Sequence, residues 1–356
     1  MRVLITGICG FVGRTLAEGL QAADRSLEIV GLDNLSRSGA WLNREPLRLR
    51  GIEVLHGDIR SAADVDAVGP VDWVVDAAAN PSVLAGVDGR VSSRQVVGHN
   101  LDGTINLLEH CKACRAGFTL ISTSRVYSIK DLMRIEVSSS NEAYSPVADQ
   151  FFPEGCSAAG IAENFSTAAP VSLYGATKLA SETLAVEYGE AFGFPVWINR
   201  CGVLAGAGQF GRADQGIFSF WIHSWLAGRP LEYLGFDGCG HQVRDCLHPR
   251  DLVPLLEKQM HETVRSGTPR WCNFGGGSGN SMSLAQLSAW CADRFGARSV
   301  ERTGRERSYD LPWVVMDCAR AGQVWDWRPL TSMEAVLEEI AGHARAHPDW
   351  LEVTGR

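Results

Sequence analysis

Residues 2–13 read Arg-Val-Leu-Ile-Thr-Gly-Ile-Cys-Gly-Phe-Val-Gly, an apolar run followed by glycines at every third position. The apolar run is typical of a buried strand, and residues 11–20 continue with the spacing of a helix that has one apolar face. Gly7, Gly10 and Gly13 therefore lie in a turn between a strand and a helix. Glycines in such a turn let backbone N–H groups approach a pyrophosphate at the helix N-terminus.

The alternation of strands and helices continues through the first 200 residues. It indicates parallel strands with helices on both faces, because each crossover between parallel strands needs a covering element. The sequence predicts an α/β fold, a Rossmann-type doubly wound parallel sheet, with ligands at the carboxyl ends of its strands. Further strands are expected at 28–33, 51–56, 72–77, 118–122 and 196–200, and long helices at 95–114 and 174–192.

An acidic residue ends the second expected strand. Asp33 follows Gly13 by 20 residues, and a carboxylate there accepts hydrogen bonds from both adenosine ribose hydroxyls and repels a 2′-phosphate. This favours NAD over NADP, although Arg37, four residues further on, weakens the preference. Asp58 and Ile59 follow the third strand, where a carboxylate can hold the adenine amino group; Asp58 could instead cap a helix.

The chain is expected to divide into two parts. Residues 1–200 are predicted to form the NAD-binding Rossmann domain. Residues 201–356 break into shorter elements and are predicted to form mostly a smaller substrate-binding lobe, with some segments returning to the main sheet. Within the first part, residues 128–171 have little periodicity, and a connection of this length is usually functional. We expect this insert to fold near the active site.

Composition limits the classes of partner. Hydrophobic residues make up 45% and charged residues 21% of the 356 residues, which excludes a disordered chain. The net charge of −8 and the lack of a basic run argue against nucleic acid or an anionic membrane as partner. The N-terminus lacks signal-peptide features and no apolar stretch could span a membrane, so a cytoplasmic location is expected. No metal site is expected, since Cys111 and Cys114 form the only Cys-x-x-Cys pair.

Tyr174 and Lys178 form a Tyr-x-x-x-Lys motif, whose side chains share one helix face. A lysine ammonium beside a phenol favours phenolate and is expected to lower the Tyr174 pKa toward neutrality. The phenol could then take a proton from a sugar hydroxyl while hydride leaves for nicotinamide. The fifth strand ends in Ser122-Thr123-Ser124, which supplies a hydroxyl to share that proton. Alone, the pair could equally be two ordinary residues of an amphipathic helix.

Taken together, these motifs resemble the NAD-dependent sugar-nucleotide epimerase/dehydratase family of extended short-chain dehydrogenases/reductases. The resemblance covers nearly the whole chain and implies that Thr123, Tyr174 and Lys178 are the catalytic residues. The motifs that carry it are TGICGFVG at 6–13, DNLSR at 33–37, GDIR at 57–60, NLDGTINLLE at 100–109, STSRVY at 122–127, YGATK at 174–178 and QVRDCLHPRD at 242–251.

The resemblance also implies the residues that hold each ligand. NAD is the implied cofactor and a CDP- or UDP-linked sugar the implied partner. The implied cofactor-binding residues are Gly7, Gly10, Phe11, Val12, Gly13, Asp33, Asn34, Ser36, Arg37, Asp58, Ile59, Ala77, Ala78, Ala79, Asn100, Tyr174 and Lys178. The substrate-binding candidates are Asn80, Ser124, Arg125, Gln209, Arg244 and Arg305.

The two residues after Thr123 limit the type of reaction that the chain is expected to catalyse. The family's 4,6-dehydratases carry an Asp-Glu pair there, whereas this chain has Ser124 and Arg125, and arginine cannot act as a general acid at neutral pH. The resemblance therefore implies an epimerase, which removes hydride and returns it to the opposite face of the ketone. The DNLSR segment and ADQG at 213–216 are most similar to 2-epimerases of CDP-linked sugars, which implies oxidation at carbon 2. A UDP-sugar 4-epimerase and a non-catalytic NAD-binding regulator are the alternatives.

Arginines are candidates for the nucleotide end of the substrate. Arg244 can hold a diphosphate as a planar fork, and Arg305 or Arg307 could form a second clamp.

A homodimer is also expected. Leu107, Leu108, Leu184 and Val186 are predicted to be exposed on the two long helices, which relatives pair into a four-helix bundle. The alternative is that these four side chains face the sheet.

Overall fold

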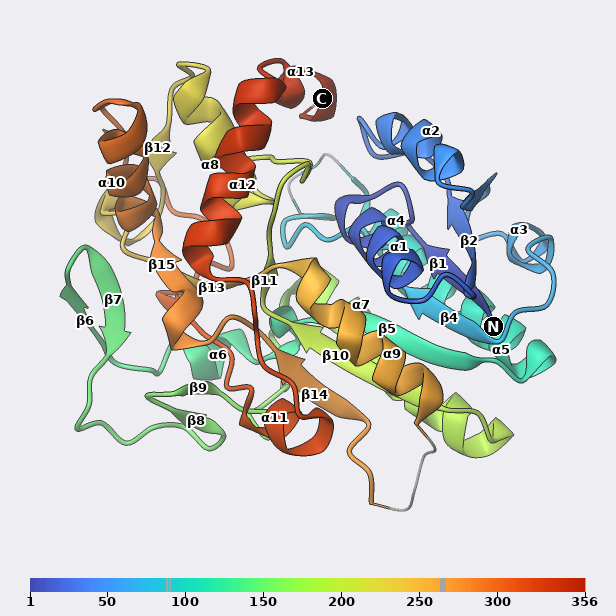
Figure 1. The fold of residues 1–356 in the computed structure, drawn as a ribbon. Coiled ribbons are helices and arrows are strands. Elements are labelled where there is room, and N and C mark those ends of the chain that lie inside the picture. Colours follow the sequence, from blue (N-terminus) through green and yellow to red (C-terminus); the bar gives the residue numbers. More distant parts are fainter. Residues whose placement is uncertain (88, 90, 263–266, 356) are drawn as a thin grey trace.

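The computed structural model of the protein describes residues 1–87, 89, 91–262 and 267–355. Figure 1 shows a large α/β part that contains the N-terminus and a smaller lobe formed by the later part of the chain.

A seven-stranded parallel sheet forms the centre of the α/β part, in the order β14-β10-β5-β4-β1-β2-β3. The chain order reverses between β1 and its neighbour β4, which places the ligand crevice at the carboxyl ends of these strands. This arrangement confirms the predicted fold class. The strands are β1 (Arg2–Thr6), β2 (Glu28–Asp33), β3 (Glu53–His56), β4 (Trp73–Asp76), β5 (Gly117–Thr123), β10 (Val196–Cys201) and β14 (Trp271–Phe274).

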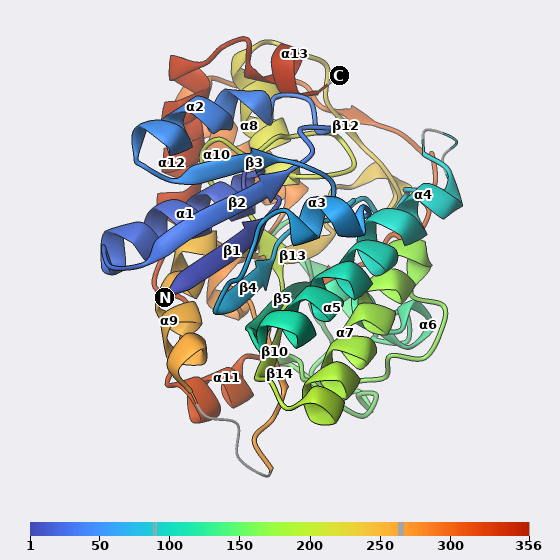
Figure 2. The same ribbon diagram turned by 90° about the vertical axis from the view of Figure 1, so that its right-hand side faces the viewer.

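Helices cover both faces of the sheet (Figure 2). One face packs against α1 (Phe11–Ala23) and α9 (Val253–His261) in a hydrophobic core that includes Leu16 and Leu20. The opposite face packs against α5 (Gly103–Cys114) and α7 (Ser172–Phe192). The remaining helices of this part are α2 (Trp41–Leu49), α3 (Ala62–Asp66) and α4 (Ser93–Val97), and a later helix, α11 (Ala319–Trp325), packs beside β14.

The helix expected at 95–114 is interrupted. Between α4 and α5 the backbone forms one π-helical turn, η1 (Gly98–Asp102), which contains Asn100. Such turns are frequent at functional sites because they redirect one side chain without ending the helix.

The expectation of exposed leucines on the two long helices is wrong. Leu107 and Leu108 are fully buried against the sheet, because they lie on the core-facing side of α5. Leu184 and Val186 of α7 are partly buried against the same core. The alternative reading of these positions is therefore the one the structure supports.

The insert at 128–171 is integral to the fold. It contains a short helix, α6 (Ile129–Leu132), and two hairpins, β6 (Val137–Ser140) with β7 (Ala143–Pro146) and β8 (Cys156–Ser157) with β9 (Gly160–Ile161). Buried side chains such as Ile161 and Phe165 pack with Val314 and Met316, which lie in and just after a later strand, β17 (Trp313–Val314).

The smaller lobe contains a sheet of β11 (Val203–Leu204), β13 (Val243–Leu247), β15 (Ser281–Ser283) and β17 (Trp313–Val314). Between β13 and β15 the chain crosses back to the large sheet, where it adds β14 beside β10. The other elements of the lobe are α8 (Ile217–Leu226), α10 (Leu284–Phe295), α12 (Met333–Ala346), α13 (Trp350–Thr354) and the short pair β12 (Glu232–Tyr233) and β16 (Glu301–Arg302).

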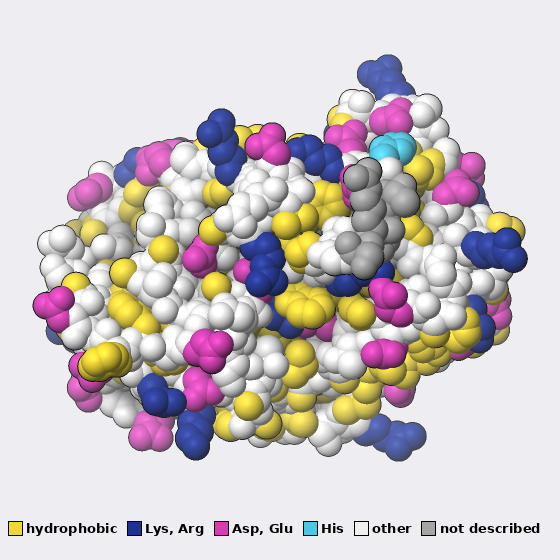
Figure 3. Space-filling model, turned by 90° about the horizontal axis from the view of Figure 1, so that it is seen from below, with side chains coloured by type: hydrophobic (Ala, Val, Ile, Leu, Met, Phe, Trp, Pro, Cys, Tyr) yellow, Lys and Arg dark blue, Asp and Glu magenta, His cyan; other side chains and the backbone are white. Residues whose placement is uncertain are grey.

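Surface charge is mixed on the face seen in Figure 3, where acidic and basic side chains are interspersed with apolar ones. Within the described part of the chain, no helix is long and apolar enough to cross a membrane.

Candidate active site

The glycine turn after β1 leaves no room for side chains. Gly7 has a φ of +61°, which favours glycine, and a Cβ at Gly13 would lie 2.3 Å from the carbonyl oxygen of Gly7. Gly10 caps α1 without a side-chain hydrogen bond, so the first amides of the helix, those of Phe11 and Val12, open toward the strand ends. This cradle fits a pyrophosphate at a helix N-terminus.

Asp33 is held at the end of β2 by two backbone amides. Its Oδ2 accepts a hydrogen bond from the N–H of Cys9 at 2.9 Å, and its Oδ1 accepts one from Leu35 at 2.8 Å. Burial raises the pKa of this carboxyl. Arg37 does not pair with it, because the Arg37 guanidinium donates to the carbonyl of Phe210 at 2.9 Å. The end of β2 therefore carries a carboxylate that does not pair with Arg37.

Asp58 also lies at a strand end, but other side chains already donate hydrogen bonds to its carboxylate. Arg60 binds its two oxygens at 3.0 and 2.7 Å, and the amide of Asn34 donates to Oδ2 at 2.9 Å. The hydrogen bonds from Arg60 lower the pKa of Asp58. Asp58 is not a helix cap, since Ser61 caps α3. The side chain of Ile59 is buried in the core.

The other residues expected at the cofactor form a rim after the carboxyl ends of β4 and β2 and in the π-helical turn η1. The amide of Ala78 donates to the Thr6 hydroxyl at 3.2 Å, and the Asn100 side chain binds the amide and carbonyl of Asn80 at 2.7 and 3.1 Å. Ala77 is partly buried, whereas Ala79 and Ser36 are exposed. Together, the glycine cradle, the acidic group of β2 and this rim match the donors and acceptors of a dinucleotide.

Thr123, Tyr174 and Lys178 come together at the carboxyl end of β5. The Thr123 hydroxyl accepts a hydrogen bond from the backbone N–H of Arg125 at 3.1 Å, and its interaction with the phenol lowers the pKa of Tyr174. Tyr174 and Lys178 are buried on the inner face of α7, with 7% and 1% of their surface exposed. Tyr174 and Lys178 therefore share the inner face of α7, and Thr123 ends the neighbouring strand β5.

Their electrostatics differ from the expectation. Burial raises the pKa of Tyr174 to about 12, against the lowering effects of Thr123 and Arg125. Burial also lowers the pKa of Lys178, whose charge is supported by the carboxylates of Asp76 and Glu182. The predicted fall of the Tyr174 pKa toward neutrality is wrong for this structure, because desolvation outweighs the lowering effects of Thr123 and Arg125.

Asp76 is a buried carboxylate that the sequence analysis missed. It ends β4, is fully buried, and accepts hydrogen bonds from the hydroxyls of Thr6 at 2.7 Å and Thr104 at 3.0 Å. Its charge favours the ammonium form of Lys178.

A buried ion pair underlies the same site and was also missed. The Glu182 carboxylate accepts hydrogen bonds from Arg200 of β10, the closest at 2.6 Å, and from the hydroxyl of Ser122 at 2.5 Å. Arg200 further contacts the Tyr127 hydroxyl at 3.4 Å. The spacing could have revealed Glu182, since it lies one helical turn after Lys178 on the same face of α7.

Two cavities are lined mostly by residues of the lobe, with a few residues of the α/β part at their walls. The smaller, about 230 Å³, is lined by Arg125, Arg244, Arg307 and Asp310 together with apolar side chains. Asp310 accepts hydrogen bonds from Arg244 at 3.3 Å and from Gln242 at 2.8 Å. This cavity therefore brings two of the predicted substrate-binding residues, Arg125 and Arg244, to one place.

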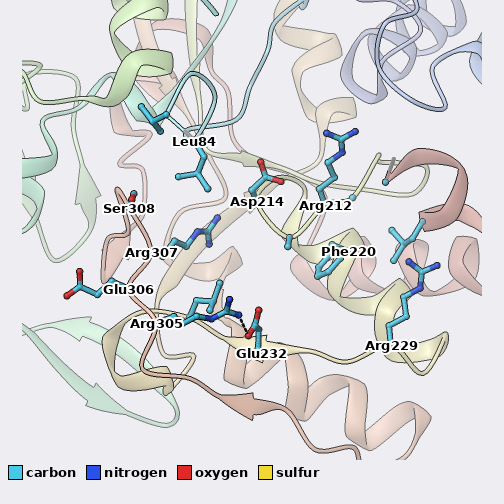
Figure 4. A pocket seen from close by; sticks show the side chains of 16 residues that line it. Leu84, Arg212, Asp214, Phe220, Arg229, Glu232, Arg305, Glu306, Arg307 and Ser308 are labelled. Atoms are coloured by element: carbon cyan, nitrogen blue, oxygen red, sulfur yellow. Dashed lines mark hydrogen bonds and ion pairs between the residues drawn. The ribbon is translucent and has the colours of Figure 1, made fainter. Parts of the chain in front are cut away.

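The larger cavity, about 540 Å³, contains Arg305 (Figure 4). The Arg305 guanidinium pairs with Glu232, whereas Arg307 lines both cavities. Arg307 is thus the better placed of the two alternatives for a second clamp. Gln209 lines neither cavity, because its amide donates to the carbonyl of Leu204 at 2.7 Å. Ser124 is buried beneath the site and does not line them.

Metal ligands do not gather at this site or elsewhere in the described ranges. No three His, Cys, Asp or Glu side chains there group as a metal site, and the cysteines at 111 and 114 are unpaired thiols.

The fold and site define an enzyme that binds a dinucleotide on a Rossmann-type sheet beside a Thr-Tyr-Lys centre. Residues 3–275 match the NAD dependent epimerase/dehydratase family. The chain belongs to this family, and NAD is its cofactor.

Curated relatives match almost the whole chain. It is 28% identical to CDP-paratose 2-epimerase from Salmonella typhi, over 96% of this chain and 98% of the relative. It is 29% identical to UDP-glucuronate 4-epimerase 1 from Arabidopsis thaliana, over 95% of this chain and 75% of the relative.

Solved structures share the fold. UDP-glucuronic acid 4-epimerase from Bacillus cereus, in complex with UDP-glucuronic acid and NAD, superposes with a TM-score of 0.77 at 23% identity, covering 97% of this chain and 99% of that one. UDP-glucose 4-epimerase from Thermus thermophilus, in complex with NAD, gives a TM-score of 0.76 at 25% identity and the same coverage.

Proposed function

We propose that the protein is an NAD-dependent epimerase of a nucleoside diphosphate sugar, and that it inverts carbon 2 of a CDP-linked hexose. The relation to CDP-paratose 2-epimerase along nearly the full length of both chains supports this substrate class. The second candidate is a UDP-sugar 4-epimerase, which the similarity to UDP-glucuronate 4-epimerase 1 favours.

One observation carries the choice of epimerisation over dehydration. The residues that follow Thr123 are Ser124 and Arg125, and Ser124 is buried beneath the site while Arg125 lines the smaller cavity. Neither side chain can donate and abstract protons on carbon at neutral pH, as water loss requires. Hydride removal and return need no such pair.

The residues of the centre then have distinct tasks. Tyr174 takes the proton of the sugar hydroxyl as the carbon is oxidised and gives it back on reduction. The hydroxyl oxygen of Thr123 accepts a hydrogen bond from the backbone N–H of Arg125. The hydroxyl hydrogen of Thr123 is therefore available to the phenol or to the substrate. Lys178 supplies a buried cation beneath them, supported by Asp76 and Glu182. NAD, when bound, supplies the hydride acceptor and donor.

The proposed binding residues follow from their positions. Gly7, Gly10 and Gly13 with the first amides of α1 would receive the pyrophosphate of NAD, and Asp33 the adenosine ribose. For the substrate, Arg244 and Arg307 flank the smaller cavity and suit a diphosphate, whose oxygens match a planar fork. Arg305, already paired with Glu232, would lie at the edge of this site.

A cytoplasmic homodimer completes the proposal. Helices α5 and α7 lie side by side on the outside of the sheet (Figure 2), as a four-helix interface between two copies would require. A non-catalytic NAD-binding role is disfavoured, because the chain retains Thr123, Tyr174 and Lys178, and the last two are buried on α7.

The test is turnover in heavy water. Purified protein is incubated with CDP- and UDP-linked sugars in D2O, and the products are identified by NMR. Inversion of a carbon without incorporated deuterium supports hydride transfer, since the transferred hydrogen never meets solvent. One deuterium on the inverted carbon would mean deprotonation and would overturn the mechanism. Conversion of UDP-sugars alone would favour the second candidate.

A further inference from the structure

Helix α13 packs against the segment that joins β2 to α2, residues 34–40. Figures 1 and 2 both show α13 beside α2, although the two helices are far apart in the sequence. One contact joins Gly39 and Thr354: a Cβ at Gly39, whose φ is +86°, would lie 2.5 Å from the Cγ2 of Thr354. Thr354 is fully buried. A side chain at position 39 would therefore have to displace α13.

Trp350 of α13 is linked to the same segment through two consecutive carbonyl groups of the lobe. The Nε1 of Trp350 donates to the carbonyl of Gln209 at 2.9 Å, and the Arg37 guanidinium donates to the carbonyl of Phe210, also at 2.9 Å. The ring of Trp350 lies between the rings of Phe210 and His343, with centroids 5.7 and 4.6 Å away. The position of Arg37 therefore depends on residues that Trp350 holds.

These contacts fix a segment that begins at the proposed ribose site. Asp33 ends β2 directly before residues 34–40, and its carboxylate accepts the N–H of Leu35. Leu35 and Ala40 pack with the same hydrophobic core as Trp350. A segment that is ordered before the ligand arrives spares the binding step that ordering, so it binds the ligand more tightly.

We propose that α13 is part of the NAD site: Trp350 and Thr354 are positioning residues that hold residues 34–40 ready for the adenosine end of NAD and slow its release. The inference rests on the proposed function only for the placement of the adenosine ribose at Asp33, since NAD as the cofactor follows from the family. An epimerase regenerates NAD in every cycle, so its reaction does not require the cofactor to leave.

Release of the cofactor from the holoenzyme tests the proposal. The protein is loaded with NADH and mixed with excess NAD, and the release rate is taken from the fall in NADH fluorescence. Trp350→Ala removes the ring and its hydrogen bond, and Gly39→Ala introduces the Cβ that Thr354 would meet. The affinity of ADP-ribose, which has the adenosine end of NAD but lacks the nicotinamide, is measured for each variant by competition with NADH.

Three further variants separate this role from general packing. Val353→Ser changes an exposed side chain of α13 itself. Leu337→Ala leaves a cavity in the separate hydrophobic core of the lobe, on α12, and so lowers stability away from the proposed contact. Thr354→Ser removes Cγ2 but keeps the hydroxyl that donates to the carbonyl of Trp350 at 2.7 Å, and it is combined with Gly39→Ala.

We expect NADH release to be about tenfold faster in Trp350→Ala and Gly39→Ala, because the need to order even one backbone residue on binding weakens affinity by about that factor. The affinity of ADP-ribose should fall by the same factor, since the effect lies at the adenosine end. Thr354→Ser should recover part of the loss in Gly39→Ala. Val353→Ser and Leu337→Ala should release NADH at the rate of the unmodified protein.

Unchanged release in both Trp350→Ala and Gly39→Ala would overturn the proposal. Equal acceleration in Leu337→Ala would overturn it too, because it would indicate loosening of the whole lobe. Faster NADH release with unchanged ADP-ribose affinity would assign the effect to the nicotinamide end and would also refute the role of α13. The expected result in a protein that converts no nucleotide sugar would sustain that role and count against the proposed function instead.

Discussion

Breaking the buried ion pair beneath the active site should be costly. Glu182 and Arg200 each expose 6% of their side chains, and Glu182 accepts three contacts from Arg200 within 3.2 Å as well as the Ser122 hydroxyl. Glu182→Gln keeps the size of the side chain but leaves the Arg200 cation uncompensated in the core. Removing one partner of a buried pair costs about 3–5 kcal/mol, so we expect the free energy of unfolding to fall by that amount.

A second glutamate of α7 provides the control. Glu190 pairs with Arg270, but 61% of its side chain is exposed, and surface pairs contribute about 0–1 kcal/mol. Glu190→Gln should therefore unfold at nearly the same urea concentration as the unmodified protein. Both variants are measured by urea denaturation at fixed NAD concentration, because a bound cofactor adds stability by mass action. Equal losses in the two variants would show that burial does not set the cost, and the reasoning would fail.

Three further outcomes are expected. Tyr174→Phe should lose about 100- to 10,000-fold in turnover while NAD(H) is still released on denaturation; retention of most activity would remove the phenol from the chemistry. The free energy of unfolding should fall as pH drops from about 6.5 to 4, because burial lowers the pKa of His343 to about 4 and that of His223 to about 3, so the unfolded chain binds more protons in this window. His343→Gln should flatten that slope in acid unfolding curves. Light scattering at micromolar concentration should give the mass of a dimer, and a monomer mass would reject the proposed pairing of α5 and α7.

The sequence predicts the central sheet well because its signals are local. Each strand is a short apolar run bounded by turn residues, and the Gly7 to Gly13 spacing gives the first crossover directly. The predicted spans of β2 and β10 agree with the structure to within one residue. The helix at 95–114 was harder, since a π-helical turn leaves the apolar spacing nearly intact and is invisible to periodicity.

Side-chain placement and burial explain the errors on α5 and at the site. Apolar spacing alone did not tell which side of α5 faces the sheet, so Leu107 was expected at the surface. Arg305 and Arg307 lie on one irregular segment, where no periodic pattern selects between them. The pKa of Tyr174 depends on how completely the folded chain excludes water, which no local motif records.

Strand β14 pairs with β10 but follows it much later in the sequence, and this affects how the protein folds during synthesis. After β10 is synthesised, residues 202–270 must leave the ribosome before Trp271–Phe274 can cover its open edge. Throughout that interval a nascent chain presents a row of unpaired amides and carbonyls on an apolar strand, which invites pairing with other chains. A fragment ending near residue 200 would carry the same exposed edge permanently. We expect such a fragment to aggregate on expression, so cutting the gene between β10 and β14 should not yield a folded N-terminal part.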